Sequence, residues 1–214
     1  MVGVVGGQNE LIQLCMADYL TGEIIINTLV SPTRKVIDWR TRISGVTPSA
    51  IAIAEARQQT LRGWRQARQE IWKHIDVDTI LVGQSLQNDL AVLKMIHTRV
   101  VDSGIPAKQA VGEGTVREWG LKRLCHELLG IEIQTGKRGH DCMEDALAAR
   151  EVVLWCSHNL QVLADWGRVK NVEETQKQVE RKEEAKRKRE RLLMVVEDAL
   201  LADGTQAGIW KTED

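Results

Sequence analysis

The sequence predicts an α/β fold in which a mixed β-sheet is flanked by helices and followed by a helical C-terminal tail. Three observations support this fold class. Two β-rich runs separated by Thr21-Gly22 lie near the start of the chain. Short apolar runs then alternate with stretches of helical periodicity, and the C-terminal segment consists mainly of charged helix-forming residues.

The first elements are a hairpin and a pair of helices. Glu10 to Val30 reads as two antiparallel strands with a turn at Thr21-Gly22, and Pro32 ends the pattern. Thr47 is placed as an N-cap before Pro48 at the first helical position. Apolar residues at helical spacing then predict helices over roughly 48–75.

The middle of the chain alternates between strand and helix. Residues 79–83 form an apolar β-branched run that ends in glycine, and residues 87–96 turn helical. Residues 98–103 predict the next strand. A Gly-rich loop is expected after it, and then a helix within 116–130 that stops at Gly130. Asp141 and Glu144 have capping-box spacing, so the last helix of the domain should begin just after His140.

The C-terminal tail differs in kind from the rest. Residues 170–204 are rich in Lys, Arg and Glu, become amphipathic at Leu192 and Val195, and reach Gly204 as an expected stop. We therefore expect a domain over 1–160 and a charged helical tail over 161–214. The tail is interpreted as a solvated helix face or as a surface that binds a protein partner. Lys186–Arg189 are also a candidate nuclear-localisation signal.

Composition excludes several classes of protein. The chain has 214 residues, 43% of them hydrophobic, and a formal net charge of −1, so no global basic field indicates a nucleic-acid-binding protein. The four cysteines show no C-x-x-C spacing, which argues against a paired-thiol zinc site or redox motif. No run is long and apolar enough for a membrane span, and no signal peptide is recognisable. We expect an intracellular protein without membrane contact, in the nucleus or nucleolus.

The aromatic residues and cysteines are interpreted structurally. Trp64, Trp72, Trp119 and Trp155 lie in helical segments and are expected to be core or helix-contact residues rather than base-stacking residues. The cysteines are expected to be small buried apolar residues.

Two carboxylates stand out. Asp145 falls in the first turn of the helix after His140 and is followed by a largely apolar stretch, so its desolvation requires a cation or hydrogen bonds. Asp89 follows the apolar run 79–83 at the start of another helix, and strand ends in α/β sheets are where ligand sites gather. The structural alternative is that Asp145 stabilises the helix dipole while His140 caps or packs.

These residues stand in segments that resemble a known family. The stretches "LVGQSLQNDLAVLK", "WGLKRLCHELLG" with "IEIQ", and "GHDCMEDALAA" are together similar to the second and third motifs of the DEDDh 3′-to-5′ exonucleases. The RNA exonucleases of eukaryotes are the branch that the chain resembles most, and "VIDWRTRISGVTP" is similar to the segment before that branch's first long helix. The order and spacing match over about residues 1–158.

The resemblance implies an RNase H-like fold and phosphodiester hydrolysis by two Mg²⁺ or Mn²⁺ ions, which lie roughly 3.5–4 Å apart in such sites. It assigns Asp89 and Asp145 to metal binding and His140 to the general base. Arg40, Arg42 and Thr47 are expected to hold the 3′ end of the substrate or to shape its pocket. RNA is the expected substrate in preference to DNA, and ribosomal RNA processing is a candidate role.

The first motif of that family, Asp-x-Glu on the first, central strand, has no counterpart in this sequence. In this branch the motif runs into Met-Val-Gly, and the chain begins with Met1-Val2-Gly3. We therefore expect the first central strand to be truncated and catalysis to be impaired. Two alternatives stay open at this point: a truncated start, or a catalytically inactive nucleic-acid-binding or scaffold protein.

Overall fold

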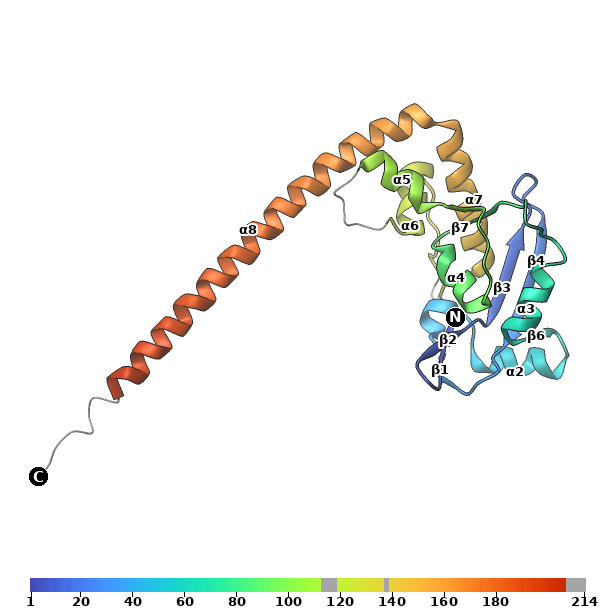
Figure 1. Cartoon of the computed structure of the whole chain (residues 1–214), viewed down its shortest axis with the longest axis horizontal. Helices are drawn as coiled ribbons and strands as arrows, with labels where there is room; N and C mark the ends of the chain where they lie inside the picture. Colours follow the sequence, from blue (N-terminus) through green and yellow to red (C-terminus); the bar gives the residue numbers. More distant parts are fainter. Residues whose placement is uncertain (113–118, 137–138, 207–214) are drawn as a thin grey trace, which may run out of the picture. The chain divides into compact units, whose positions relative to one another are not determined.

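The computed structural model describes residues 1–112, 119–136 and 139–206, with side chains described as far as 195. Three small β-sheets and eight α-helices lie in the described part, together with one π-helical turn. Figure 1 shows the strands gathered at the N-terminal end of the chain with helices packed around them. The α/β class predicted from the sequence is confirmed, although the single mixed sheet is divided into three.

The first sheet is formed by short strands from the beginning of the chain. β1 (Val2–Val4) pairs antiparallel with β2 (Gln8–Glu10) on one side and β5 (Val36–Asp38) on the other. Val2 and Val4 are fully buried and pack with Ile12, Val46 and Ile51. This small core fixes the residues that follow Met1.

The predicted hairpin forms the second sheet. β3 (Gln13–Ala17) and β4 (Ile24–Ser31) pair antiparallel, as expected from the sequence. The Asp18 carboxylate accepts hydrogen bonds from the backbone N–H groups of Leu20 and Thr21 at 2.9 and 2.7 Å, and Gly22 adopts a positive φ of 76°. The turn therefore depends on a side-chain acceptor and on a glycine at the left-handed position.

The expectation of helices throughout 48–75 is only partly correct. α2 (Pro48–Ala56) begins as predicted, with the Thr47 hydroxyl accepting from the Ala50 N–H, and α3 (Gly63–Ile71) follows later. Between them lies β6 (Thr60–Arg62), which pairs parallel with β4 and makes the second sheet mixed. Pairing with a strand about thirty residues earlier overrides the local helical pattern.

The third sheet consists of the two predicted strands of the middle segment. β7 (Leu81–Gly83) and β8 (Val100–Asp102) pair parallel, and α4 (Leu86–Leu93) lies in the crossover between them. Within the described residues, β3 has a strand partner only in β4, and β7 has one only in β8. The sheet is thus interrupted between β3 and β7.

Two further expectations need correction. The segment after β8, expected to be a loop, contains α5 (Gly104–Val111), whose first N–H is bound by the Asp102 carboxylate at 2.9 Å. The helix expected within 116–130 starts at α6 (Leu121–Leu124) and continues as the π-helical turn η1 (Cys125–Leu129). Residues 113–118, at the start of that prediction, lie outside the described residues. Gly130 ends the element with φ 68°, as expected.

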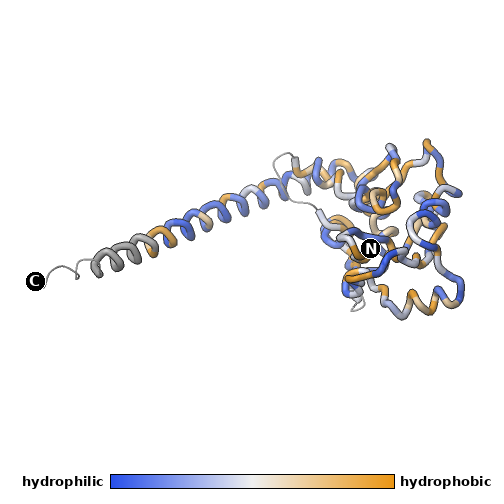
Figure 2. The backbone as a smooth tube through the Cα atoms, turned by 60° about the horizontal axis from the view of Figure 1, so that its bottom comes forward, coloured by the Kyte–Doolittle hydropathy of each residue, from blue (hydrophilic) through white to orange (hydrophobic). Residues whose placement is uncertain are grey.

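The last two helices carry the remainder of the chain. α7 (Cys142–His158) is capped by Asp141, whose carboxylate accepts from the Met143 and Glu144 N–H groups. α8 (Leu160–Gln206) continues through Gly204, so the predicted stop there is wrong. Its charged middle is hydrophilic in Figure 2. No helix in the described part is both long and apolar enough to cross a membrane.

The chain divides into two compact units, Met1–Gly167 and Arg168–Asp214. The division falls inside α8, whereas the sequence places the boundary near residue 160. The main helical core of the first unit contains Trp119 and the buried thiols of Cys125 and Cys156, with Trp155 packed against it. The structural interpretation of these four residues is confirmed.

Candidate active site

A large cavity lies at the interruption of the sheet. Its volume is about 1220 Å³, and it is lined by β3 and β7 and by residues of α3, α4 and α7. On β3 the side chains alternate: Leu14 packs into the cluster that contains Ala67 and Ile71 of α3, whereas Cys15 contacts Cys142 at the start of α7. Helices therefore cover the cavity on both faces of the broken sheet.

Three of the residues predicted from the sequence meet in this cavity. Asp89, His140 and Asp145 all line it, together with Met1 and Gln84. Asp89 is in the first turn of α4, directly after β7, and Asp145 is in the first turn of α7. The carboxyl end of a parallel strand and two helix N-termini thus converge, which is the arrangement expected of a ligand site in this class of fold.

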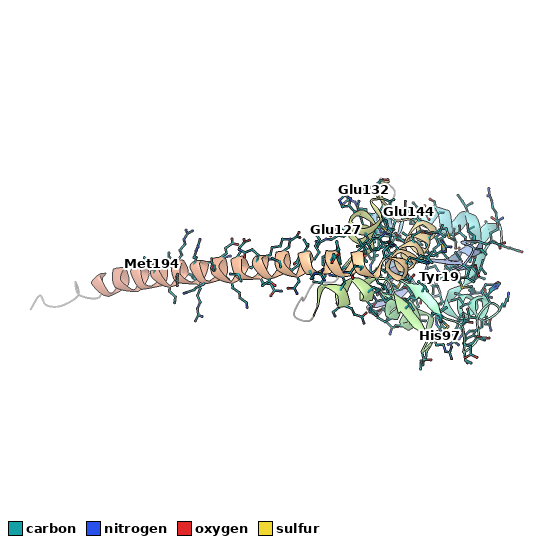
Figure 3. The ribbon with its side chains drawn as sticks, turned by 90° about the horizontal axis from the view of Figure 1, so that it is seen from above. Tyr19, His97, Glu127, Glu132, Glu144 and Met194 are labelled. Carbon is teal, nitrogen blue, oxygen red and sulfur yellow. The ribbon has the colours of Figure 1, made fainter. Side chains whose placement is uncertain are left out.

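Hydrogen bonds compensate the Asp145 carboxylate. Its Oδ1 accepts from Gln134 Nε2 at 2.8 Å, and its Oδ2 lies 3.3 Å from His140 Nδ1. The capping box is only half formed, because Glu144, labelled in Figure 3, accepts from the Gln134 backbone N–H instead of reaching back to Asp141. Gln134 therefore fixes both acidic residues of the first turn.

His140 is held by its backbone. Its N–H donates to the Ile43 carbonyl at 2.7 Å, which attaches it to the short helix α1 (Thr41–Ser44). Gly139 has φ 90°, and a Cβ there would lie 2.6 Å from Gly45 N. Only glycine permits this close approach, so a backbone contact places His140, and its imidazole faces the cavity and Asp145.

The Asp89 carboxyl group has a different electrostatic environment from that of Asp145. Desolvation raises the pKa of the Asp89 carboxyl, and the nearby amino group of Met1 opposes that rise. Burial lowers the pKa of the Met1 amino group, whereas Asp89 raises it. Although Asp89 as a whole residue is exposed, its carboxyl group is crowded by the cavity wall. Met1 thus enters the cavity beside one of the two candidate metal ligands.

The residues assigned to substrate binding do not line the cavity. Arg40 forms an ion pair with Asp38 at 3.3 Å, Arg42 is exposed on α1, and the Thr47 hydroxyl caps α2. However, α1 binds His140 through Ile43, so the segment containing Arg40 and Arg42 lies next to the cavity mouth. Their contact with substrate stays a prediction.

Sequence reasoning missed three polar side chains of the site. Gln134 adopts φ 56° in the segment between η1 and α7, and no periodicity predicts its contact with Asp145. Cys15 and Cys142 were expected to be buried core thiols but are half-buried and face each other at the cavity, where a hydrogen bond with Cys15 lowers the pKa of the Cys142 thiol. The only sequence signal for Cys142 was its position beside the capping residue.

The carboxylates present do not account for a pair of metal ions. Among the residues that the structure describes, no three His, Cys, Asp or Glu side chains come together in a metal-binding group. Mg²⁺ requires nearly octahedral oxygen coordination and two bridged ions need several carboxylates. Asp89 and Asp145, the two predicted metal ligands, are too few for such a set.

Comparison with known proteins identifies the group to which these features belong. The family described as exonuclease (RNase T type) matches residues 1–153, which include the whole cavity region. The chain belongs to the exonuclease family. This membership confirms the coarser part of the resemblance drawn from the motifs.

Curated relatives of this exonuclease-family chain carry RNA nuclease names. It is 33% identical over 144 residues to RNA exonuclease 3 of Candida albicans, covering 67% of this chain and 33% of the relative. It is 37% identical over 137 residues to small RNA degrading nuclease 2 of Arabidopsis thaliana, covering 62% and 28%. The exonuclease-family chain thus spans about a third or less of the length of these relatives.

Solved structures show the same fold. The Saccharomyces cerevisiae Pan2 pseudoubiquitin hydrolase–RNA exonuclease module with AAGGAA RNA aligns with a TM-score of 0.64 at 22% identity, covering 80% of this chain and 28% of that one. The Neurospora crassa Pan2 catalytic unit aligns with a TM-score of 0.61 at 19% identity, covering 75% and 26%. The RNase H-like class of the exonuclease-family chain is therefore confirmed.

Proposed function

We propose that this chain is the nuclease domain of a 3′-to-5′ exonuclease that acts on RNA with the help of divalent metal ions. The observation that carries the proposal is the meeting of Asp89, His140 and Asp145 in one cavity at the end of β7. Family membership and the RNA nuclease names of the relatives support a hydrolytic function on RNA. Members of the DEDDh group, to which we assign the chain, use Mg²⁺ or Mn²⁺.

Within this proposal His140 is the general base. Asp145 Oδ2 lies 3.3 Å from His140 Nδ1, so it can orient the ring and leave Nε2 to take a proton from water. Metal ions in such a site stabilise the attacking and leaving oxygens of the phosphodiester. Asp89 and Asp145 would hold part of the metal pair.

We assign the remaining metal ligands to an Asp-x-Glu motif on a strand that would lie between β3 and β7. β3 and β7 each have an edge without a described strand partner, and the cavity between them admits Met1. A strand running into Met1 would pair with those edges and bring two further carboxylates beside Asp89. With Asp89 and Asp145 as the predicted metal ligands of this site, we expect residues 1–214 by themselves to bind the metal pair weakly.

The decisive experiment adds a short apolar strand ending in Asp-x-Glu directly before Met1. We expect Mg²⁺- or Mn²⁺-dependent shortening of a 5′-labelled RNA oligonucleotide from its 3′ hydroxyl end, and no shortening when that end is blocked. The matched control carries the same extension with Asn-x-Gln. A folded extended protein that binds Mn²⁺ but leaves RNA intact would refute the nuclease assignment.

A second candidate is a catalytically inactive nucleic-acid-binding or scaffold protein. It is favoured for residues 1–214 because no three His, Cys, Asp or Glu side chains among the described residues form a metal-binding group. Binding of RNA without cleavage, in both the original and the extended protein, would support this candidate. Precursors of ribosomal RNA are the first natural substrates to test. We also propose a nuclear location, which is tested by deleting Lys186–Arg189 and following where the protein accumulates in the cell.

A further inference from the structure

A cluster of tryptophans and cations lies outside the candidate active site. Trp64, Arg65, Arg68 and Trp72 come from α3 and the residue after it, and Lys94 is the C-cap of α4. We call these five residues the tryptophan–arginine patch. The cavity described above contains none of them.

Three cations share one indole in this patch. Arg65 and Arg68 Cζ lie 4.5 and 4.7 Å from the centre of the Trp64 ring, and Lys94 Nζ lies 4.7 Å from it. Arg68 is also 4.6 Å from the Trp72 ring centre, so its guanidinium contacts both indoles. Cation–π contacts at such distances hold the charged groups in place.

The charge of the patch is not neutralised by acidic side chains. Over the described residues, no carboxylate forms an ion pair with Arg65, Arg68 or Lys94. Nearby cations differ, because Lys73 pairs with Glu70, and Arg99 pairs with Asp78. Arg68 Nη1 donates to the Lys94 carbonyl at 2.7 Å, and its buried Nε has no hydrogen-bond partner in the described structure. The patch therefore presents positive charge that no described carboxylate neutralises.

The aromatic part of the patch indicates which anion. Trp72 is 51% exposed, so it is not a core residue, whereas Trp64 is half-buried and packs against the core cluster of Ala67 and Ile71, as expected. Exposed indoles next to cations bind single-stranded nucleic acids, because bases stack on the ring while phosphates meet the charges. An acidic peptide would use the charges but would have no need of the exposed ring.

A small cavity adjoins the patch. It has a volume of about 320 Å³ and is lined by Trp64, Lys94, Arg34 and the polar side chains of Gln8 and Asn9. Glu10 also lines it, but its carboxylate is already engaged. It accepts from Thr33 N–H at 2.6 Å and lies 3.5 Å from Arg34. The cavity thus extends the patch with cationic and amide groups that suit a nucleotide.

We infer that the tryptophan–arginine patch is a second binding site for single-stranded RNA, which holds the strand upstream of the end that enters the candidate active site. The choice of RNA rests on the proposed function. α4 carries Asp89 in its first turn and Lys94 at its C-cap, and a helix rises about 1.5 Å per residue, so these two residues are about 7–8 Å apart along the helix axis. Because the two sites share this short helix, we expect one RNA strand to pass from one site to the other.

The test is binding of a fluorescein-labelled single-stranded RNA of about twelve nucleotides in EDTA, followed by anisotropy at several salt concentrations. Arg65→Glu and Lys94→Glu should each weaken binding by roughly tenfold. Each should also reduce by about one the slope of log affinity against log salt concentration. Trp72→Leu should weaken it by roughly 5- to 150-fold, the range for stacking of one base. Arg65→Gln repeats the test without charge reversal, should Arg65→Glu unfold.

The matched control is Arg57→Glu, because Arg57 is an exposed arginine at the end of α2, outside the patch. Equal loss of affinity in Arg57→Glu and Arg65→Glu would overturn the inference, as would unchanged affinity in Trp72→Leu. Equal competition by polyglutamate would reassign the patch to acidic proteins. Because EDTA prevents metal-dependent cleavage, this result is independent of the nuclease assignment, which is judged by the extended protein alone.

Discussion

At the scale of single residues, the contact between Asp145 and His140 determines the proposed chemistry. His140→Ala, made in the protein extended with an Asp-x-Glu strand, should lower the rate of RNA digestion by roughly 10²- to 10⁴-fold, the usual effect of losing a general base. The backbone hydrogen bond from residue 140 to Ile43 is retained, so the thermal midpoint should change little. Full activity in this variant would show that another group takes the proton.

Asp89 provides a prediction about pH. Desolvation raises the pKa of Asp89 above its ordinary value of 3.8. Between the pKa of the unfolded chain and the raised pKa of the folded protein, the folded protein therefore binds more protons at this group. Folding stability from this group therefore rises as the pH falls through the raised pKa. Asp89→Asn should raise the thermal midpoint at pH 7 in EDTA, and the gain should disappear in acid.

Asp76 is the matched control for that measurement. A side-chain hydrogen bond from Thr79 and backbone hydrogen bonds from Asp78 and Thr79 lower the pKa of this exposed carboxyl. Its contribution to stability is present at neutral pH and is lost as the pH falls through the lowered pKa. Asp76→Asn should therefore lower the thermal midpoint at pH 7. A shift of the midpoint in the same direction in Asp89→Asn and Asp76→Asn would contradict the physical causes given for the two pKa shifts.

At the scale of elements, the approach of Gly139 to α1 is the contact that places His140. Gly139→Ala would introduce a Cβ 2.6 Å from Gly45 N in a backbone with φ 90°. Gly6→Ala is the matched control, because Gly6 has φ 93° with nothing within 4 Å of a Cβ. Both should lose about 1 kcal/mol to backbone strain, and Gly139→Ala should lose more because of the clash. Equal free energies of unfolding for the two variants would show that the segment around Gly139 shifts and relieves the clash.

The elements also show what the sequence could reveal. The hairpin, α2 with its Thr47 cap, β7, β8 and the start of α7 follow from local patterns and were predicted. β6 was missed because Thr60–Arg62 becomes a strand only by pairing with Leu29–Ser31. α5 was missed because its start depends on Asp102 binding the Gly104 N–H. In the site, Asp89, His140 and Asp145 carry sequence signals, whereas the Gln134 contact depends on an irregular backbone.

At the scale of the whole molecule, stability should depend on the interrupted sheet. An apolar strand added before Met1 would pair with the edges of β3 and β7 and fill part of the 1220 Å³ cavity. The extended protein should unfold at a higher urea concentration than the original chain. The control extension carries prolines at two strand positions, which remove N–H donors. Equal midpoints for all three proteins would contradict the proposed place of the strand.

The edges of β3 and β7 that have no partner strand among the described residues also bear on solubility. An open strand edge offers its N–H and C=O groups to any other chain, so two molecules can join edge to edge. β3 has a register irregularity between Met16 and Ala17, and β7 is only three residues long, and both features shorten the stretch available for such pairing. Concentrated solutions of the chain should nevertheless form aggregates rich in intermolecular β-structure, which dilution or a strand added before Met1 suppresses.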